Sequence, residues 1–189
     1  MDKAGAPRIV GTSSSPVLSK IVRQTNVLSD NFYAEALFRQ MGEKASGIAV
    51  YDSCRVAVYE VLEGLMDSDL AGIRLEDGSG LSRLNSASPA FLVSFLRSMT
   101  RSRGFDAFLA SLPQPGEGTL NTLLPKLTPA QKARIRVKSG SMDGVLCYSG
   151  YILDEQGKPA RIFSLMVNGA TAKTAALRET LGGLIEAML

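Results

Sequence analysis

The sequence predicts an α+β protein in which helices come first and an antiparallel sheet comes last. Apolar residues recur at helical spacing through most of residues 16–127. The pattern then changes to short apolar runs separated by turn residues, which is typical of antiparallel strands. One more helical stripe ends the chain and is expected to cover the sheet. A length of 189 residues suits one domain, so we expect a helical part at about 16–127 and a strand part at about 133–189 of the same domain.

Two predicted helices at the start of the chain meet at a polar turn. Residues 1–14 are expected to form an extended lead-in. Pro16 should begin a helix that runs to about Leu28, because proline suits the first helical turn. Ser29-Asp30-Asn31 interrupts this helix. A second helix follows, and Gly42 is expected to stop it, since glycine is common at helix C-termini.

Two longer helices, a loop and a short helix are predicted next. A strong helical period over residues 47–66 predicts the third helix. Residues 77–83 form a turn-rich loop whose glycines permit positive φ. Ser88-Pro89 is typical of a helix start, and this helix should run to about Thr100. A short helix is expected at about 105–112.

Three strands and a final helix complete the predicted fold. Ile135–Lys138 is a short strand, and Val145–Leu153 is apolar on both faces, as a central strand should be. Asp154–Lys158 makes a hairpin turn, and Arg161–Val167 returns as the third strand. Residues 177–188 carry the apolar stripe of the last helix.

Charge and hydropathy exclude several classes of partner. The formal charge of +3 comes from 21 basic and 18 acidic residues that are scattered along the chain. A nucleic-acid partner is therefore not expected, because such proteins cluster their basic residues. No apolar run reaches the length of about 18 residues that a membrane span needs. The segment after Met1 also lacks the apolar core of a secretory signal peptide.

The chain contains no histidine. Ser-His-Asp and Cys-His catalysis and most zinc sites are thereby excluded within this sequence, and no metal site is expected. Cys54 and Cys147 fit neither a metal spacing nor a disulfide framework, so both are expected to be buried free thiols. Proton transfer near neutral pH would have to use a lysine, a carboxylate or a tyrosine with a shifted pKa.

Ser29-Asp30-Asn31 is the first motif that could carry chemistry. These three residue types also cap helices, and a capping cluster between two helices explains them equally well. In the functional interpretation, Ser29 relays a proton to a leaving amine and Asn31 donates its amide to a substrate carbonyl. Asp30 would then hold the turn.

Lys138-Ser139-Gly140-Ser141 is the second motif, and it lies on a predicted edge strand. A strand that simply ends at a glycine is the alternative explanation. In the functional interpretation, Lys138 supplies a fixed positive charge. Gly140 allows a ligand backbone to approach closely, and Ser139 and Ser141 offer hydroxyl groups suited to a carboxylate. The Ser141 N–H could complete an oxyanion hole.

Serine enzymes that act on penicillin-like substrates combine S-D-N and K-[ST]-G with a nucleophile motif, S-x-x-K. None of the lysines in this chain has a serine three residues before it. The sequence therefore carries the back half of such a site, and its nucleophile is expected elsewhere.

The chain resembles the penicillin-binding D-alanyl-D-alanine carboxypeptidase/endopeptidase family of the DacB type. The resemblance covers nearly the whole sequence, in the right order. Besides the two motifs, it rests on Ser15–Ser19, Asn26, Asn31–Glu35, Asp77–Arg83, Asn85, Ser88-Pro89, Ser111–Pro113, Gly118–Leu120 and Gly144 to Tyr151. Ser139 stands where threonine is commoner, a change that keeps the hydroxyl.

The resemblance implies a β-lactamase/transpeptidase-like fold, with an antiparallel sheet flanked by helices and a helical subdomain. It implies a serine peptidase of the periplasm or cell envelope that cleaves peptidoglycan stem peptides through an acyl-enzyme, is acylated by β-lactams, and needs no cofactor. By resemblance the catalytic residues here are Ser29, Asn31 and Lys138, and the substrate-binding residues are Ser139, Gly140 and Ser141.

Two alternatives stay open. The absent S-x-x-K favours a non-catalytic module that keeps the cleft and binds stem peptides or a cell-wall partner, while a β-lactamase fragment is a weaker possibility. The chain as given is expected not to be acylated. By resemblance, strands from an upstream region would pair beside Arg161–Val167, so without them we expect this strand to support a homodimer.

Overall fold

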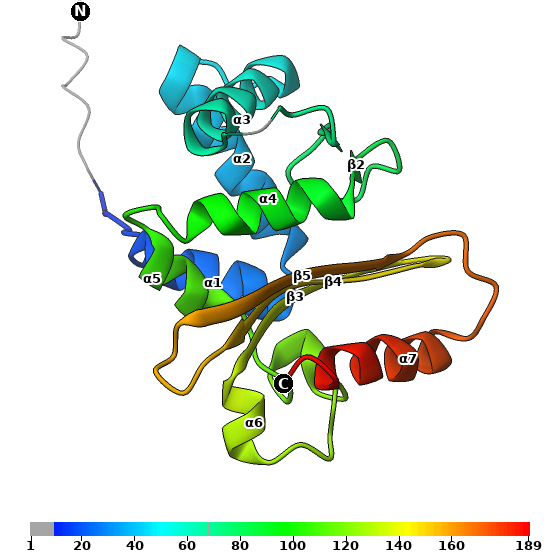
Figure 1. Ribbon diagram of the computed structural model, residues 1–189. Helices are drawn as coiled ribbons and strands as arrows, with labels where there is room; N and C mark the ends of the chain where they lie inside the picture. The colour runs from blue at the N-terminus through cyan, green and yellow to red at the C-terminus, as the bar shows by residue number, and fades with distance from the viewer. Residues whose placement is uncertain (1–9, 68) are drawn as a thin grey trace, which may run out of the picture.

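The structure, a computed structural model, describes residues 10–67 and 69–189, so residues 1–9 of the expected lead-in lie outside it. The fold is α+β, as predicted, with helices before a three-stranded antiparallel sheet (Figure 1). The helices are α1 (Leu18–Leu28), α2 (Asn31–Ser46), α3 (Tyr51–Leu65), α4 (Pro89–Met99), α5 (Phe105–Ser111), η1 (Gly118–Leu120), α6 (Pro129–Ala133) and α7 (Thr174–Glu186). The strands are β1 (Ile73–Arg74), β2 (Ser86–Ala87), β3 (Ile135–Met142), β4 (Val145–Leu153) and β5 (Pro159–Val167).

The sheet has the order β3-β4-β5, and β4 lies in the centre as its apolar sequence predicts. β3 is longer than the predicted strand because the hairpin turn falls only at Asp143-Gly144, where Gly144 has φ 69°. Met142 consequently pairs with Val145, and the whole Lys138–Ser141 motif lies on the strand. β5 starts two residues before the predicted Arg161.

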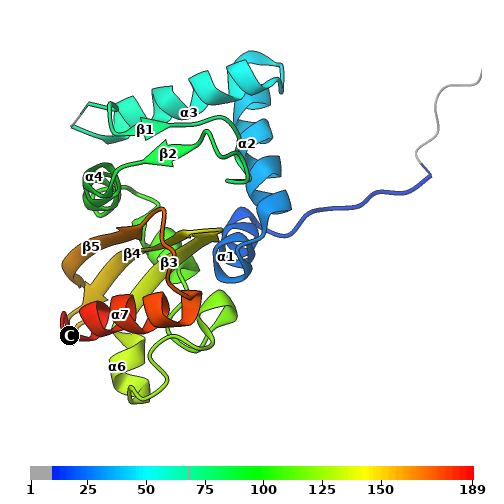
Figure 2. The ribbon, with the colours of Figure 1, turned by 90° about the vertical axis from the view of Figure 1, so that its right-hand side faces the viewer.

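Helices cover both faces of this sheet. α7 lies on one face, and α1, α4 and α5 lie on the other (Figures 1 and 2). The core under α7 contains Leu146, Ile152 and Ile185, while the core under α4 and α5 contains Leu96 and Tyr151. The Tyr151 hydroxyl donates to the Leu96 carbonyl at 2.8 Å, so the buried phenol has a partner.

A second, smaller layer stands above α4 and consists of α2, α3 and the two-stranded β1–β2 ladder (Figure 2). Its core packs Leu62 and Met66, from the end of α3, against Phe91 of α4. α4 begins as predicted, because the Ser88 side chain accepts from the Phe91 N–H at 3.0 Å and Pro89 occupies the first turn.

The prediction that Gly42 stops α2 is wrong. Gly42 is a buried residue inside α2, and a Cβ added there would lie 2.5 Å from the Sγ of Cys54 on α3. Glycine is therefore required for the close packing of two helices. The helix ends instead at Gly47, whose φ of 74° lies in the left-handed region.

The two thiols differ in burial. Cys54 is fully buried, as expected, whereas Cys147 is only half-buried because it lies beside cavities at the surface of the sheet. Both cysteines are free. Among the described residues, no helix is both long and apolar enough to cross a membrane.

Candidate active site

Ser29 lies at the sharp junction of α1 and α2. It adopts φ 55° and ψ 48°, a left-handed conformation that a non-glycine residue rarely takes. Asp30 then caps α2, since its carboxylate accepts from the Tyr33 N–H at 3.0 Å. The capping explanation of the motif is thus correct for Asp30. Ser29 is left with a half-buried side chain that is not used by the cap.

Lys138 reaches this junction from the edge strand β3. Its Nζ donates to the Ser29 Oγ at 2.8 Å, across 109 positions of sequence. The same Nζ donates to the Ser139 carbonyl oxygen at 2.5 Å, which fixes the direction of the side chain. The two motifs found in the sequence therefore meet at one point.

The environment of Lys138 disfavours its charge. Burial lowers the pKa of the Lys138 ammonium from 10.5 to about 8. Among the described residues, no carboxylate lies within salt-bridge distance of this lysine. With a pKa of about 8, Lys138 is a cation at neutral pH and loses its proton about one pH unit higher.

The rest of the second motif continues along β3. The Ser139 Oγ lies 2.9 Å from the Thr119 Oγ1. Thr119 is brought there by Gly118, which has φ 47° and at which a Cβ would lie 2.0 Å from the Val27 carbonyl oxygen. Gly140 and Ser141 are exposed on the free edge of the sheet.

A small cavity of about 310 Å³ opens beside Lys138, and its walls are mostly apolar. Asn26 supplies an amide at its rim and donates from Nδ2 to the Ser111 Oγ at 2.7 Å. Ser111 in turn donates to the Phe108 carbonyl at 2.6 Å. The other lining residues are Leu92, Phe95, Leu96, Phe108, Leu112, Ser139, Gly140, Cys147 and Ser149.

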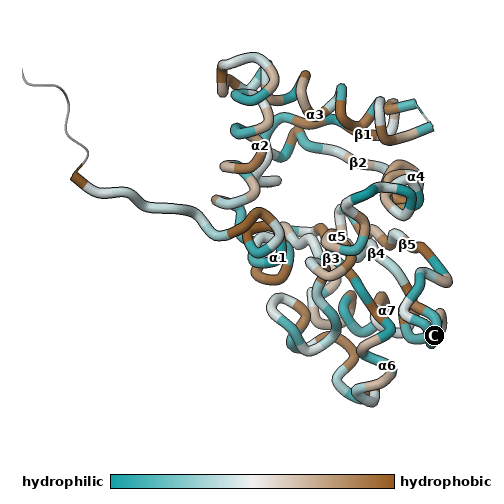
Figure 3. The backbone as a smooth tube through the Cα atoms, turned by 90° about the vertical axis from the view of Figure 1, so that its left-hand side faces the viewer, coloured by the Kyte–Doolittle hydropathy of each residue, from teal (hydrophilic) through white to brown (hydrophobic). Residues whose placement is uncertain are grey.

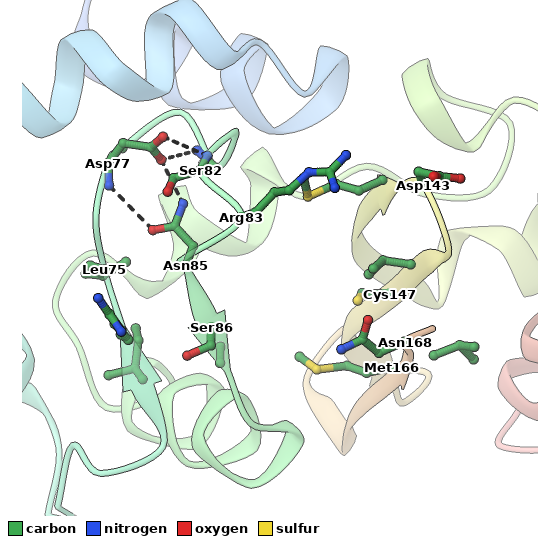
Figure 4. Close-up of a pocket in the computed structure, with 18 residues that line it drawn as sticks. Leu75, Asp77, Ser82, Arg83, Asn85, Ser86, Asp143, Cys147, Met166 and Asn168 are labelled. Carbon is green, nitrogen blue, oxygen red and sulfur yellow. Dashed lines mark hydrogen bonds between the residues drawn. The ribbon is translucent and has the colours of Figure 1, made fainter. Parts of the chain in front are cut away.

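A larger cavity of about 620 Å³ lies at the other end of β3 (Figure 4). One wall is formed by β1, β2 and the loop 75–85 between them, and the other by the β3–β4 turn and the end of β5. Arg83 points across this cavity toward Asp143. Cys147 lines both cavities, so they are neighbours along the sheet.

Hydrogen bonds hold the loop wall in one shape. The Asp77 carboxylate accepts from the N–H groups of Gly80 and Ser82 and from the Asn85 Nδ2, and the Asn85 Oδ1 accepts from the Glu76 N–H at 2.7 Å. Burial acts to raise the pKa of Asp77, but these hydrogen bonds outweigh it, so its pKa is lowered.

The structure brings some of the predicted site residues together and leaves others apart. Ser29 and Lys138 are in direct contact, and Ser139 is one residue further along the strand. Asn31 is exposed at the first position of α2, and Ser141 is exposed further along β3. Asn26 and Ser111, which bond to each other, and Thr119, which contacts Ser139, are contributions to the site that the sequence did not assign. All three residues lie in segments that resemble the carboxypeptidase family, and this resemblance could have identified them.

An antiparallel sheet covered on both faces, with a helical layer above and a lysine on its edge strand, defines the β-lactamase/transpeptidase-like fold class. The chain belongs to the D-Ala-D-Ala carboxypeptidase 3 (S13) family, whose sequence profile matches residues 2–186.

Two curated relatives share about a third of their aligned residues with this chain. A D-alanyl-D-alanine carboxypeptidase of Actinomadura sp. (strain R39) is 34% identical over 167 residues, which cover 85% of this chain and 30% of the relative. The penicillin-sensitive carboxypeptidase A of Dictyostelium discoideum is 30% identical, with 84% and 31% covered. The chain thus spans about a third of the length of these relatives.

Solved structures share the fold. Penicillin binding protein 4 (dacB) of Haemophilus influenzae, complexed with a β-lactam, superimposes with a TM-score of 0.76 at 24% identity and covers 89% of this chain and 41% of its own. A penicillin G-acylated predatory endopeptidase of Bdellovibrio bacteriovorus, in complex with an immunity protein, gives 0.64 at 16% identity, with 90% and 45% covered.

Proposed function

We propose that this chain is the C-terminal part of a serine-type D-Ala-D-Ala carboxypeptidase or endopeptidase that cleaves peptidoglycan stem peptides and binds β-lactams. The observation that carries the proposal is the 2.8 Å contact between Lys138 and Ser29. It joins the two motifs at the edge of the sheet, beside a cavity. Family membership supports the same activity.

The contact supports complementary roles for Lys138 and Ser29. The Lys138 ammonium donates to the Ser29 oxygen, so the hydroxyl proton of Ser29 is free to go to a third group, such as a leaving amine. The lysine charge faces the place where negative charge develops on a substrate carbonyl or carboxylate. Asn31 and the Ser141 N–H would hold the substrate from two sides.

The free edge of β3 suits an extended peptide. Exposed backbone groups on an edge strand can pair with a ligand strand, and a Cβ at Gly140 would meet only the Cys147 Cβ, at 3.8 Å. Met142 lies four positions after Lys138, a span of about 13 Å in a strand. A peptide that begins at Lys138 would therefore reach the large cavity.

The nucleophile is the missing part. No S-x-x-K motif occurs in this sequence. Because the family resemblance implies that this motif precedes the region matched here, we propose that the attacking serine lies in an upstream segment of the complete protein. We place that protein in the periplasm or cell envelope, where its substrate is. A non-catalytic module that binds stem peptides through the same cleft is the second candidate, and the absence of the nucleophile favours it for the chain alone.

Labelling with a fluorescent penicillin tests the proposal. The complete protein should form a stable covalent adduct, and the 189-residue chain should form none. Lys138→Ala in the complete protein should slow acylation by about 10²- to 10³-fold, the cost of losing charge stabilisation at an oxyanion. The control is Lys44→Ala, an exposed lysine on α2. Equal acylation rates for the two variants would remove Lys138 from the site. A covalent adduct on the isolated chain would refute the claim that this chain lacks the nucleophile.

A further inference from the structure

Glu35 links helix α2 to the loop that walls the large cavity. Its Oε2 accepts from the Gly78 N–H at 2.9 Å and from the Ser79 N–H at 3.2 Å. Its other oxygen accepts from the Arg39 Nε at 2.9 Å, which orients the carboxylate. The side chain of Glu35 is only 21% exposed. Two backbone donors of the loop thus depend on one carboxylate of the helix.

The loop sits directly on α2 at the same place. A Cβ on Gly78 would lie 2.2 Å from the Phe38 Cβ and 2.9 Å from the Ala34 carbonyl oxygen. Only glycine permits this approach without a shift of the backbone. The Glu35 contact and the bare Gly78 backbone therefore fix the loop against one turn of α2.

Closing the loop does not require Glu35. Asp77 and Asn85 already tie the two ends of the loop together. At its base the loop is also held to α3, where the Arg55 Nη1 donates to the Glu76 Oε2 at 3.0 Å and the Tyr59 hydroxyl accepts from the Leu75 N–H at 3.2 Å. What Glu35 adds is the position of the loop relative to α2.

The position of the loop relative to α2 matters because α2 begins at the Lys138 site and the loop forms a wall of the large cavity. α2 starts directly after Ser29-Asp30, so its first turn is fixed to the Lys138 contact. The loop carries Arg83 on the wall opposite Asp143, at the end of β3 (Figure 4). The Glu35 contact therefore lies between the Lys138 site, at the start of α2, and the loop that forms one wall of the large cavity.

We propose that Glu35 is a positioning residue that holds the loop 75–85 at the distance from β3 that a peptide ligand requires. This inference rests on the proposed function, because it assumes that the peptide runs from Lys138 into the large cavity. Glu35 touches no ligand itself and acts only through the backbone of Gly78 and Ser79.

The test combines amide hydrogen exchange with a binding titration of the 189-residue chain. The probe is a synthetic stem pentapeptide that ends in D-Ala-D-Ala. Glu35→Ala should speed exchange at Gly78 and Ser79 and weaken peptide binding by about tenfold, because the binding-competent loop is populated less often. Glu35→Gln keeps an acceptor oxygen and should recover part of both losses. Glu43→Ala is the matched control, since Glu43 is an exposed residue two turns further along α2.

Each outcome decides between two claims. Unchanged exchange at Gly78 and Ser79 in Glu35→Ala would overturn the link between helix and loop. Faster exchange with unaltered peptide affinity would show that Glu35 is structural only, which also overturns the inference. If the unmodified chain does not bind the peptide, or binds it equally well with Lys138→Ala, the proposed function itself fails.

Discussion

The ammonium group of Lys138 belongs to a half-buried side chain, and its side-chain partner is a hydroxyl rather than a carboxylate. Burial lowers its pKa to about 8. The Ser29 oxygen accepts from the ammonium, a hydrogen bond that favours the charged form. The Lys138 Nζ should therefore titrate near pH 8 by heteronuclear NMR, and Ser29→Ala should lower that midpoint further. A midpoint near the ordinary lysine value would contradict the burial of this group.

The same shift predicts a dependence of stability on pH. The unfolded chain holds the Lys138 proton more tightly than the folded chain does, so stability contributed by this group rises with pH between about 8 and 10.5. Below pH 8 the lysine is protonated in both the folded and the unfolded chain, so the full cost of burying its charge is present. Lys138→Met should stabilise the chain by about 1–3 kcal/mol at neutral pH in urea unfolding, because it removes a buried charge.

That gain should shrink as the pH is raised from 8 to 10.5. Lys44→Met, at an exposed position of α2, serves as the control and should show no comparable gain. A gain for Lys138→Met that stays constant over this range would mean that the lysine proton is not the cause.

The meeting of Ser29 and Lys138 could be predicted because each lies in a short polar motif at a break or an edge of an element. The hydrogen bond between Asn26 and Ser111 could not be predicted from the helical pattern, since one polar residue within it looks like any other exposed position. Only the family resemblance singles these two residues out. Their contact depends on how α1 packs on α5, which periodicity does not determine.

At the scale of elements, the packing of α2 on α3 depends on the bare backbone of Gly42. A Cβ there would lie 2.9 Å from the backbone N and Cα of Cys54, so one helix would have to move. Gly42→Ala should therefore cost about 1–3 kcal/mol of stability in thermal or urea unfolding. Gly64→Ala is the matched control on α3, where nothing lies within 4 Å, and it should be neutral or slightly stabilising. Equal effects of the two substitutions would argue against close packing at Gly42.

The two edges of the sheet differ in their protection against pairing. β3 carries Arg136 and Lys138 near its middle, whereas β5 carries only Arg161 near its start and no charged residue over Ile162–Val167. Among the described residues no strand pairs with the outer side of β5. We propose, as the sequence predicts, that the isolated chain dimerises through this edge.

Light scattering over a range of concentrations tests the dimer. Met166→Lys adds a charge to β5 and should shift the chain toward monomer, while Leu184→Lys, at an exposed position of α7, should not. A monodisperse monomer at high concentration would refute association through β5.

Element boundaries were predictable where a local signal marks them. Ser88-Pro89 marks the start of α4, and the apolar run Val145–Leu153 marks β4 without error. The ladder of β1 and β2 was missed because two-residue strands have no period to detect. Gly42 was misassigned because glycine at a helix end and glycine at a helix crossing look identical in sequence.

For the molecule as a whole, the order of the layers could be predicted from the sequence, but the cavities could not. α1 illustrates why: hydrophobic residues colour part of it brown in Figure 3, yet it has no fully buried residue, and Leu18 and Leu28 are 63% and 56% exposed. A pattern shows that a helix has an apolar face, not what that face contacts. The cavities likewise arise between segments far apart in the chain, such as the loop 75–85 and the β3–β4 turn.

The central claim is that Lys138 and Ser29 act as one unit on the substrate, and a double-mutant cycle on penicillin acylation of the complete protein tests it most directly. Ser29→Ala, Lys138→Ala and the double variant are compared with the unmodified protein. If the two groups act through their contact, the double variant should be about as slow as Lys138→Ala alone. Losses that multiply in the double variant would show that the two side chains act independently, and would contradict the account.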